Sequence, residues 1–354
     1  MSRIKVTRRR NKLDVSTFPA IWRLVNLPEE SPPFELASSS NRAQLNAMPA
    51  QLIVVAYHYV RDLPRTRFPR IKGMLTDNFR RQVLLLGERY EMATLESALA
   101  FLAGKYQPAR DLCLLTFDDG LKDHYSDVLP VLAERHIQGL FFVPTACLGG
   151  LVASVHKSHF LMAALDFEEY RQAFLRRLAE FSPGTRTEVN MIEAQLAYRW
   201  DAPEVAAFKY LLNFGLPEAL RDQILDDLFA EYLGDESEFA RQLYLSWDEA
   251  REMQTAGMLI GGHSHNHVAL SLMDDDCQRA DLETCAELLH SRLNLQPLWP
   301  FTYPFGQSKT FNSLTVQSLR DLGFACSFTT ELGINGANQD PFSIRRIDTN
   351  DVVV

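Results

Sequence analysis

A short apolar run that ends in two acids constrains the fold of this chain more than any other stretch. Residues 112–117 are apolar or β-branched, and Asp118, Asp119 and Gly120 follow them directly. Such a run is typical of a strand buried on both faces, and the glycine allows a turn where the strand ends. Because successive strand residues project to opposite sides, one acid could bind a metal while the other accepts a proton. Asp-Asp-Gly by itself is also a common turn.

A histidine-rich segment is the second feature that indicates chemistry. Residues 261–267 read Gly-Gly-His-Ser-His-Asn-His, follow the apolar stretch 258–260, and hold three of the chain's nine histidines. His263 and His267 are four residues apart, which predicts that they share one side of a helical turn. Imidazoles with a carboxylate are a usual ligand set for zinc and related divalent ions. The segment therefore predicts a metal site rather than isolated core or surface histidines.

The two segments together carry a family resemblance. The sequence TFDDG at 116–120, combined with H-S-x-x-H at 263–267, resembles the paired signature of the polysaccharide deacetylases. These are metal-dependent carbohydrate esterases that remove N-acetyl or O-acetyl groups from sugars. The resemblance implies an α/β fold, a distorted (β/α) barrel of the polysaccharide deacetylase type with an inserted helical subdomain.

The resemblance also implies roles for the acids and histidines. Asp119, His263 and His267 would hold a divalent metal ion, with Zn²⁺ as the first choice and Co²⁺, Ni²⁺ or Mn²⁺ as alternatives. Asp118 would be the catalytic base that takes a proton from the attacking water.

The general acid is predicted near the front of the chain. His58 lies near the carboxyl end of an apolar, β-branched strand predicted at 52–59. This segment resembles that of a circularly permuted branch of the family, in which the histidine motif usually found near the carboxyl terminus lies near the amino terminus. By this resemblance His58 would protonate the leaving amine. No histidine follows His290, so the usual carboxyl-terminal motif is absent. Either His58 replaces it or the general acid is missing.

The family's third motif is altered in this chain. Thr302 stands where many relatives have an arginine that contacts the catalytic base. Arg346 matches the arginine of the variant branch, and a guanidinium beside Asp118 would hold that carboxylate ionised. The alternative is that Arg346 is a surface charge. A backbone N–H near Tyr303 is predicted to steady the oxyanion.

The sequence divides into an arm, a barrel and an insertion. Residues 1–50 lack periodicity apart from a short helix predicted at 20–25. The barrel is assigned to 51–148 and 244–354. Long amphipathic patterns such as 167–181 predict a helical insertion over 149–243, at the catalytic face. For the basic residues that open it, His156, Lys157 and His159, surface or packing roles are favoured over a place in the pocket.

The composition limits the classes of binding partner and the cellular location expected for the protein. The formal net charge of −9 excludes nucleic acid and anionic membrane as principal partners, because both require a basic surface. Five scattered cysteines without a C-x-x-C pair are typical of buried thiols in a reducing compartment. The basic start has no apolar region after it, and no apolar stretch is long enough to cross a bilayer. The predicted location is the cytoplasm, without stable membrane insertion.

The predicted function is a metal-dependent deacetylase acting on an acetylated glycan or glycan precursor, with N-acetyl as the first choice of linkage. Two alternatives stay open. One is a metal hydrolase of the same fold that acts on a non-sugar C–N bond or an ester. The other is a non-catalytic glycan-assembly scaffold that retains a metal site, against which the second acid, Asp118, argues.

Overall fold

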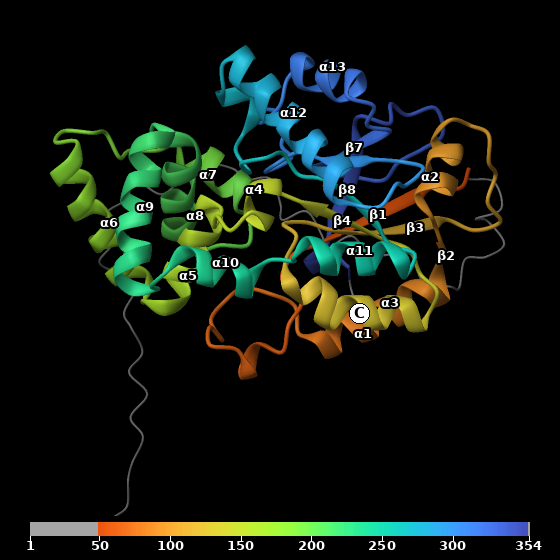
Figure 1. Ribbon diagram of the computed structural model, residues 1–354, viewed down its shortest axis with the longest axis horizontal. Coiled ribbons are helices and arrows are strands. Elements are labelled where there is room, and N and C mark those ends of the chain that lie inside the picture. The colour runs from red at the N-terminus through yellow and green to blue at the C-terminus, as the bar shows by residue number, and fades with distance from the viewer. Residues whose placement is uncertain (1–48, 353–354) are drawn as a thin grey trace, which may run out of the picture.

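The structure, a computed structural model, describes residues 49–352 (Figure 1). The predicted helix at 20–25, and all but the end of the predicted arm, lie outside this range. The strands are β1 (Leu52–Tyr57), β2 (Glu91–Met92), β3 (Leu112–Phe117), β4 (Gly139–Val143), β5 (Leu259–Gly262), β6 (Pro300–Thr302), β7 (Cys326–Leu332) and β8 (Ile344–Asp348). The helices are α1 (Thr76–Arg89), α2 (Leu95–Leu102), α3 (Leu129–Glu134), α4 (Thr145–Leu148), α5 (Ser154–Ala164), α6 (Phe167–Phe181), α7 (Met191–Ala197), α8 (Pro203–Tyr210), α9 (Glu218–Tyr232), α10 (Glu236–Leu243), α11 (Trp247–Thr255), α12 (Asp275–Arg292) and α13 (Ser313–Asp321).

The sheet closes on itself. Its strands run in the order β1-β8-β7-β6-β5-β4-β3, and β1 also pairs with β3, so seven parallel strands form a closed barrel. The short strand β2 pairs in parallel with the beginning of β3, at Leu112 and Cys113. The predicted (β/α) barrel is therefore confirmed. Because all strands of the barrel are parallel, their carboxyl ends meet at one rim, where catalytic residues of such barrels lie.

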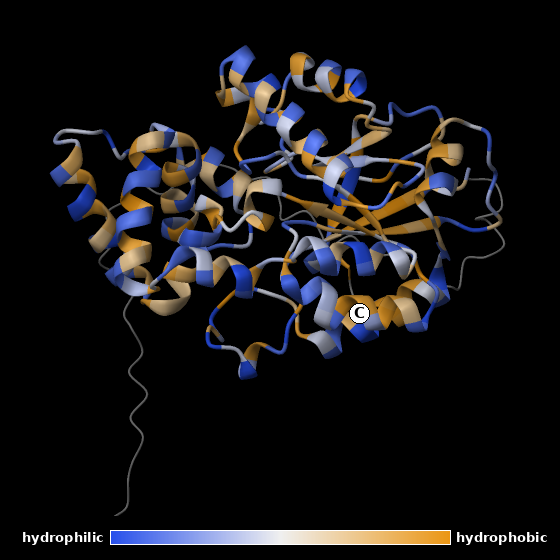
Figure 2. Ribbon diagram, in the orientation of Figure 1, coloured by the Kyte–Doolittle hydropathy of each residue, from blue (hydrophilic) through white to orange (hydrophobic). Residues whose placement is uncertain are grey.

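Side chains of the strands alternate between two apolar clusters. Leu112 and Leu114 of β3 meet residues of β1, β4, β5, β7 and β8 in the barrel interior, together with α2 at the end where the strands begin. Cys113, Leu115 and Phe117 instead pack outward, in the cluster that includes α1, α3, α11, α12 and α13. The strands accordingly direct hydrophobic residues to both sides. Figure 2 shows that hydrophobic residues predominate along the strands of the sheet. With a period of two, the residue after Phe117 is directed inward again.

Six helices, α5 to α10, follow β4 and precede α11 and β5, and they gather beside the barrel (Figure 1). They have an apolar cluster of their own, built around residues such as Phe160, Phe174 and Phe229. Tyr59 and Leu121, from the loops that follow β1 and β3, join the same cluster. The exact limits of the insertion, 149–243, stay a prediction, but this cluster is what would hold such a unit against the barrel.

Two local features of the barrel follow from the residue types at element ends. The Ser246 side chain accepts a hydrogen bond from the Glu249 N–H, and the Glu249 side chain accepts one from the Ser246 N–H. These two hydrogen bonds form a capping box at the start of α11. The turn after β3 uses Gly120 at a φ of +61°, a conformation that favours glycine.

Within 49–352 no helix combines the length and the apolar character needed to span a membrane.

Candidate active site

Asp118 and Arg346 meet in the interior of the barrel. Asp118 follows β3 on the inward side, and Arg346 is the inward-facing residue in the middle of β8. The guanidinium donates from Nη1 to Asp118 Oδ1 at 2.8 Å and from Nη2 to Oδ2 at 2.7 Å. A third hydrogen bond, from Nε to the carbonyl oxygen of Thr329 at 2.8 Å, fixes its orientation. The contact predicted between these two residues is thus present, and Arg346 is not a surface charge.

This bidentate pair controls the charge of Asp118. Both residues are 2% exposed. Burial by itself raises the pKa of Asp118, but the charge and hydrogen bonds of Arg346 outweigh burial and leave that pKa below its usual value. Asp118 is therefore ionised at neutral pH and held in one orientation, which are the two properties that a catalytic base requires.

Asp119 is directed away from Asp118, toward the histidine-rich segment. Its Oδ1 atom lies 3.4 Å from His263 Nε2 and 3.2 Å from His267 Nε2. The candidate ligand atoms of these three buried residues all lie within 4.8 Å of one another. Burial raises the pKa of Asp119, yet the adjacent histidines more than compensate and hold it well below the usual range.

The protonation of this cluster fits a divalent cation. His263 Nδ1 lies 2.8 Å from the carbonyl oxygen of Thr302, which can only accept, so Nδ1 carries a proton and Nε2 is the ring nitrogen available to a cation beside Asp119. Burial lowers the pKa of His267 to about 4, so this imidazole is neutral at pH 7. Neutral imidazoles and an ionised carboxylate are the forms in which these side chains bind metals. The donor set suits zinc and related ions.

The two histidines converge through a loop and not through a helical turn. Residues 263–267 are irregular, with Ser264 at a φ of +61° and His267 at +55°. The prediction that they share one side of a helical turn was wrong, because these left-handed residues reverse the chain between them. Asp119 and Phe305 also have positive φ values, so four of the six such non-glycine residues between 49 and 352 lie at this site.

A buried carboxylate holds this loop in place. Asp281 on α12 accepts hydrogen bonds from the His265 N–H at 2.7 Å and from the Asn266 N–H at 3.0 Å. Thr145, at the start of α4, bonds His265 Nδ1 at 2.8 Å from the other side. The loop thus has contacts with two helices, and the spacing of its histidines alone does not reveal them.

His156 reaches the metal cluster from the insertion. This α5 residue has no exposed surface, and its Nε2 lies 3.0 Å from Asp119 Oδ2, the oxygen that faces away from His263 and His267. Its Nδ1 lies 2.6 Å from the Tyr244 hydroxyl, which also accepts a hydrogen bond from the Ala153 N–H at 3.1 Å. These partners place the His156 proton on Nε2, where it is donated to Asp119.

Sequence reasoning missed this contact. A packing role was favoured for His156, and the residue is indeed buried, but it also bonds a candidate metal ligand. The position of His156 beside other basic residues at the start of the insertion gave no signal of a partner 37 positions earlier. Its neighbours behave differently: Lys157 pairs with Asp226 and Glu236, and His159 lies 3.4 Å from the Tyr59 hydroxyl.

His58 lies at the same rim, on the solvent side. Its side chain is 45% exposed, and its Nε2 lies 3.8 Å from Asp118 Oδ2, beyond hydrogen-bond distance. The backbone is fixed by His124, whose Nε2 lies 2.9 Å from the His58 carbonyl oxygen. His58 is therefore anchored beside Asp118 with its ring open to an incoming molecule.

Tyr303 does not offer the predicted oxyanion donor. Its N–H is donated to the carbonyl oxygen of Phe328 at 3.2 Å, because β6 continues its pairing with β7 at this position. The side chain is fully buried, and its hydroxyl donates to the Phe342 carbonyl oxygen at 3.0 Å. Tyr303 is thus a packing residue, and its own N–H is not free for an oxyanion. An oxyanion donor from another backbone N–H near Tyr303 stays a prediction.

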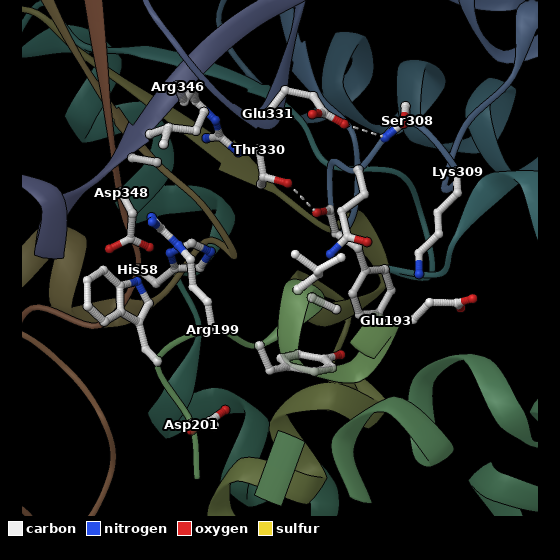
Figure 3. A pocket seen from close by; sticks show the side chains of 18 residues that line it. His58, Glu193, Arg199, Asp201, Ser308, Lys309, Thr330, Glu331, Arg346 and Asp348 are labelled. Atoms are coloured by element: carbon white, nitrogen blue, oxygen red, sulfur yellow. Dashed lines mark hydrogen bonds between the residues drawn. The ribbon is translucent and has the colours of Figure 1, made fainter. Parts of the chain in front are cut away.

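A cleft of about 790 Å³ opens beside these residues. His58 and Arg346 line it, and so does Phe305, whose ring lies 5.5 Å from that of His267. In Figure 3, His58, Arg346 and Asp348 lie along one side of the cleft with Arg199 of the insertion beside His58. Ser308, Lys309 and Glu193 lie on the opposite side. The metal cluster and Asp118 adjoin the cleft through these contacts.

Comparisons with known proteins agree with the motifs and the fold. The family model described as polysaccharide deacetylase matches residues 227–327, a segment that contains His263 and His267 but neither acid of the Asp pair. YxkH of Bacillus subtilis (strain 168), a candidate polysaccharide deacetylase, is 28% identical over 116 residues, which are 31% of this chain and 36% of that protein. The chain therefore covers little more than a third of the length of this relative.

Two solved structures share the fold. The Streptococcus pyogenes deacetylase PplD, in complex with acetate, matches with a TM-score of 0.51 and 18% identity over 85% of this chain and 93% of that chain. IcaB from Ammonifex degensii matches with a TM-score of 0.52 and 20% identity, again over 85% and 93% of the two chains. The predicted resemblance to the polysaccharide deacetylases is confirmed.

Proposed function

We propose that this relative of the polysaccharide deacetylases is a metal-dependent hydrolase that removes an acetyl group, with N-acetyl as the first choice, from a sugar of a polysaccharide or its precursor. One observation carries the proposal. An ionised, arginine-paired carboxylate, Asp118, lies directly beside the Asp119, His263 and His267 cluster at the catalytic rim of the barrel. A metal site alone does not require a second buried acid, whereas hydrolysis requires a base.

The reaction assigns one task to each residue. Asp119, His263 and His267 would hold the cation, which when bound polarises a carbonyl oxygen and lowers the pKa of a neighbouring water. Asp118 accepts a proton from the water whose oxygen attacks the acetyl carbon. His58 donates a proton to the sugar nitrogen as the C–N bond breaks, so acetate and a free amine leave. Arg346 acts through Asp118 in this scheme, because its two hydrogen bonds keep that base ionised and oriented.

Acetate release provides the primary test. Metal-loaded and metal-stripped protein are incubated with a panel of N-acetylated and O-acetylated sugars and glycans, and bound metal is measured in parallel. We expect release only from the loaded protein. Bound metal without release from any substrate would favour a hydrolase of another C–N bond or ester, or a scaffold. A protein that binds no divalent metal would overturn the proposal entirely.

Replacing Arg346 tests the state of the base. In Arg346→Met the buried Asp118 carboxylate loses the bidentate hydrogen bonds of the guanidinium, and burial then raises the pKa of Asp118. Because the base acts in its ionised form, we expect the acid limb of the pH–rate profile to shift to higher pH than in the wild type. Breaking the buried pair should also cost about 3–5 kcal/mol of stability.

The measurement for Arg346→Met is a pH–rate profile together with thermal unfolding and metal content. Arg346→Lys is the matched control, since it restores a positive charge without the bidentate geometry and should recover part of the acid-side activity. An unaltered profile in Arg346→Met would refute the assigned role.

Replacing His156 tests the support of the metal ligand. In His156→Ala the Oδ2 atom of Asp119 loses its donor, and we expect about 10–100-fold weaker metal binding, the usual effect of losing such an outer contact. Affinity is measured by competition with a chelating dye. His159→Gln, on the same helix but bonded to Tyr59, is the control and should bind as the wild type does. Equal affinities in both variants would contradict the role of His156.

A further inference from the structure

The helical insertion leaves and rejoins the barrel beside the candidate metal ligands. We call residues 145–153, which lead into α5, the entry stem, and residues 244–246, which follow α10, the exit stem. Helix α4 of the entry stem lies next to α10, at the side of the insertion that faces the barrel (Figure 1). Each stem is hydrogen-bonded to one of the two segments that carry the metal cluster.

The entry stem holds the histidine-rich loop. The N–H groups of Thr145 and Ala146 donate to the carbonyl oxygens of Ser264 and His265, at 3.2 Å and 3.0 Å. These hydrogen bonds continue the parallel pairing of β4 with β5 beyond the ends of both strands. The loop that carries two of the three candidate ligands is therefore bonded to the first residues that lead into the insertion.

The exit stem holds the turn that carries Asp119. Tyr244 forms an isolated antiparallel β-bridge with Leu121, and the Leu245 N–H donates to the carbonyl oxygen of Gly120 at 2.9 Å. Tyr244, Leu245 and Leu121 are all buried. The exit stem is therefore bonded to the two residues that directly follow the third candidate ligand.

The Tyr244 hydroxyl connects the two stems with the ligand itself. This hydroxyl accepts a hydrogen bond from the Ala153 N–H of the entry stem at 3.1 Å, and it lies 2.6 Å from His156 Nδ1. His156 in turn donates from Nε2 to Asp119 Oδ2 at 3.0 Å. Because Tyr244 and His156 are almost completely buried, water does not compete for these hydrogen bonds. Tyr244 thus positions His156 and, through it, Asp119.

We propose that the metal centre and the two stems open and close as one unit, with Tyr244 as the positioning residue that connects them. This inference rests on the metal site of the proposed function. A cation held by Asp119, His263 and His267 would tie the turn after β3 to the histidine-rich loop, and hence the exit stem to the entry stem. By thermodynamic linkage, metal binding then opposes opening of the stems, and opening of the stems weakens metal binding by the same factor.

Hydrogen exchange of the backbone amides tests this coupling. Exchange of the peptides that contain the two stems is followed by mass spectrometry in metal-stripped protein and at increasing free Zn²⁺, and β3 reports global unfolding. In the stripped protein we expect the stems to exchange faster than β3. Free Zn²⁺ at about 100 times its Kd should slow exchange of the stems about 100-fold, because the opened form has lost the arrangement that binds the metal.

Replacing Tyr244 tests its positioning role. In Tyr244→Phe the His156 ring loses the hydroxyl that orients it, so we expect about tenfold weaker Zn²⁺ binding and correspondingly less protection of the stems at the same free Zn²⁺. In a His156→Ala background, Tyr244→Phe should weaken Zn²⁺ binding no further, whereas a merely structural loss would add to that of His156→Ala.

Tyr170→Phe is the matched control. It also removes a buried hydroxyl that bonds α5, since Tyr170 donates to Ser158 Oγ at 3.1 Å, but it leaves the contacts of His156 intact. Its Zn²⁺ affinity and its exchange should equal those of the wild type.

The outcomes separate this inference from the function on which it rests. Stems that exchange together with β3, Zn²⁺ that binds without slowing them, or unchanged Zn²⁺ affinity in Tyr244→Phe would overturn the coupling and leave the proposed function standing. Zn²⁺-dependent protection in a protein that releases no acetate from any substrate would retain the coupling and overturn the deacetylase. A protein that binds no divalent metal would overturn both.

Discussion

Asp118→Asn is expected to bind metal as the wild type does and to lose turnover by roughly 10²–10⁴-fold, the usual contribution of a general base. The reason is that two adjacent residues have different roles, Asp118 as the base and Asp119 as a metal ligand. Asp118 is bonded to Arg346, whereas the carboxylate of Asp119 faces the histidines. An asparagine at 118 keeps the shape of the side chain and leaves the metal cluster intact, but it does not accept a proton.

The Asp118→Asn variant also leaves Arg346 with a buried, unbalanced charge, and the resulting loss of stability must be separated from the loss of chemistry. A double variant, Asp118→Asn with Arg346→Met, removes both charges. We expect it to regain much of the stability lost by either single variant, because the unpaired charge is gone, and to remain inactive. Metal content, thermal unfolding and acetate release are measured on all three. Turnover that survives in Asp118→Asn would eliminate Asp118 as the base.

Asp119→Asn should lose both the metal and the activity. Asp119 is the common contact of the cluster: His263 and His267 approach one of its oxygens, and His156 approaches the other. Replacing the carboxylate removes a charged ligand directly, so we expect metal binding to weaken by more than about 100-fold, beyond the effect of losing an outer contact. Asparagine is preferred to alanine here because the residue has a φ of +77°, which asparagine tolerates.

Removal of the metal from the wild type should reproduce the Asp119→Asn phenotype without the mutation. Chelation is expected to abolish acetate release, to leave the circular dichroism spectrum largely unchanged and to lower the unfolding temperature, because a ligand that binds only the folded state stabilises it. Adding Zn²⁺ back should restore the wild type but not Asp119→Asn at the same concentration. Full metal content in an inactive Asp119→Asn protein would contradict its assignment as a ligand.

The sequence by itself determined the parallel strands and the positions of the reactive residues. Apolar runs such as 112–117 and 139–143 have the length and composition of strands buried on both faces, and helical patterns separate them, so parallel pairing follows from local physics. The closed barrel was implied by the family resemblance. The Asp pair and the histidine segment each follow a strand. Because parallel strands end at one rim, their convergence at that rim was predictable without knowledge of any contact.

The pairings within the site were decided only by the tertiary structure. Arg346 reaches Asp118 across 228 positions because the barrel closes between β8 and β1, which brings two inward-facing residues together. His156 reaches Asp119 because a helix of the insertion packs against the rim. The Tyr303 N–H donates its hydrogen bond to Phe328 of β7, a partner that the sequence around Tyr303 does not reveal. Local sequence specifies which side chains an element presents and at what period. Which of them meet depends on strand order, closure and helix packing, and these are properties of the whole fold.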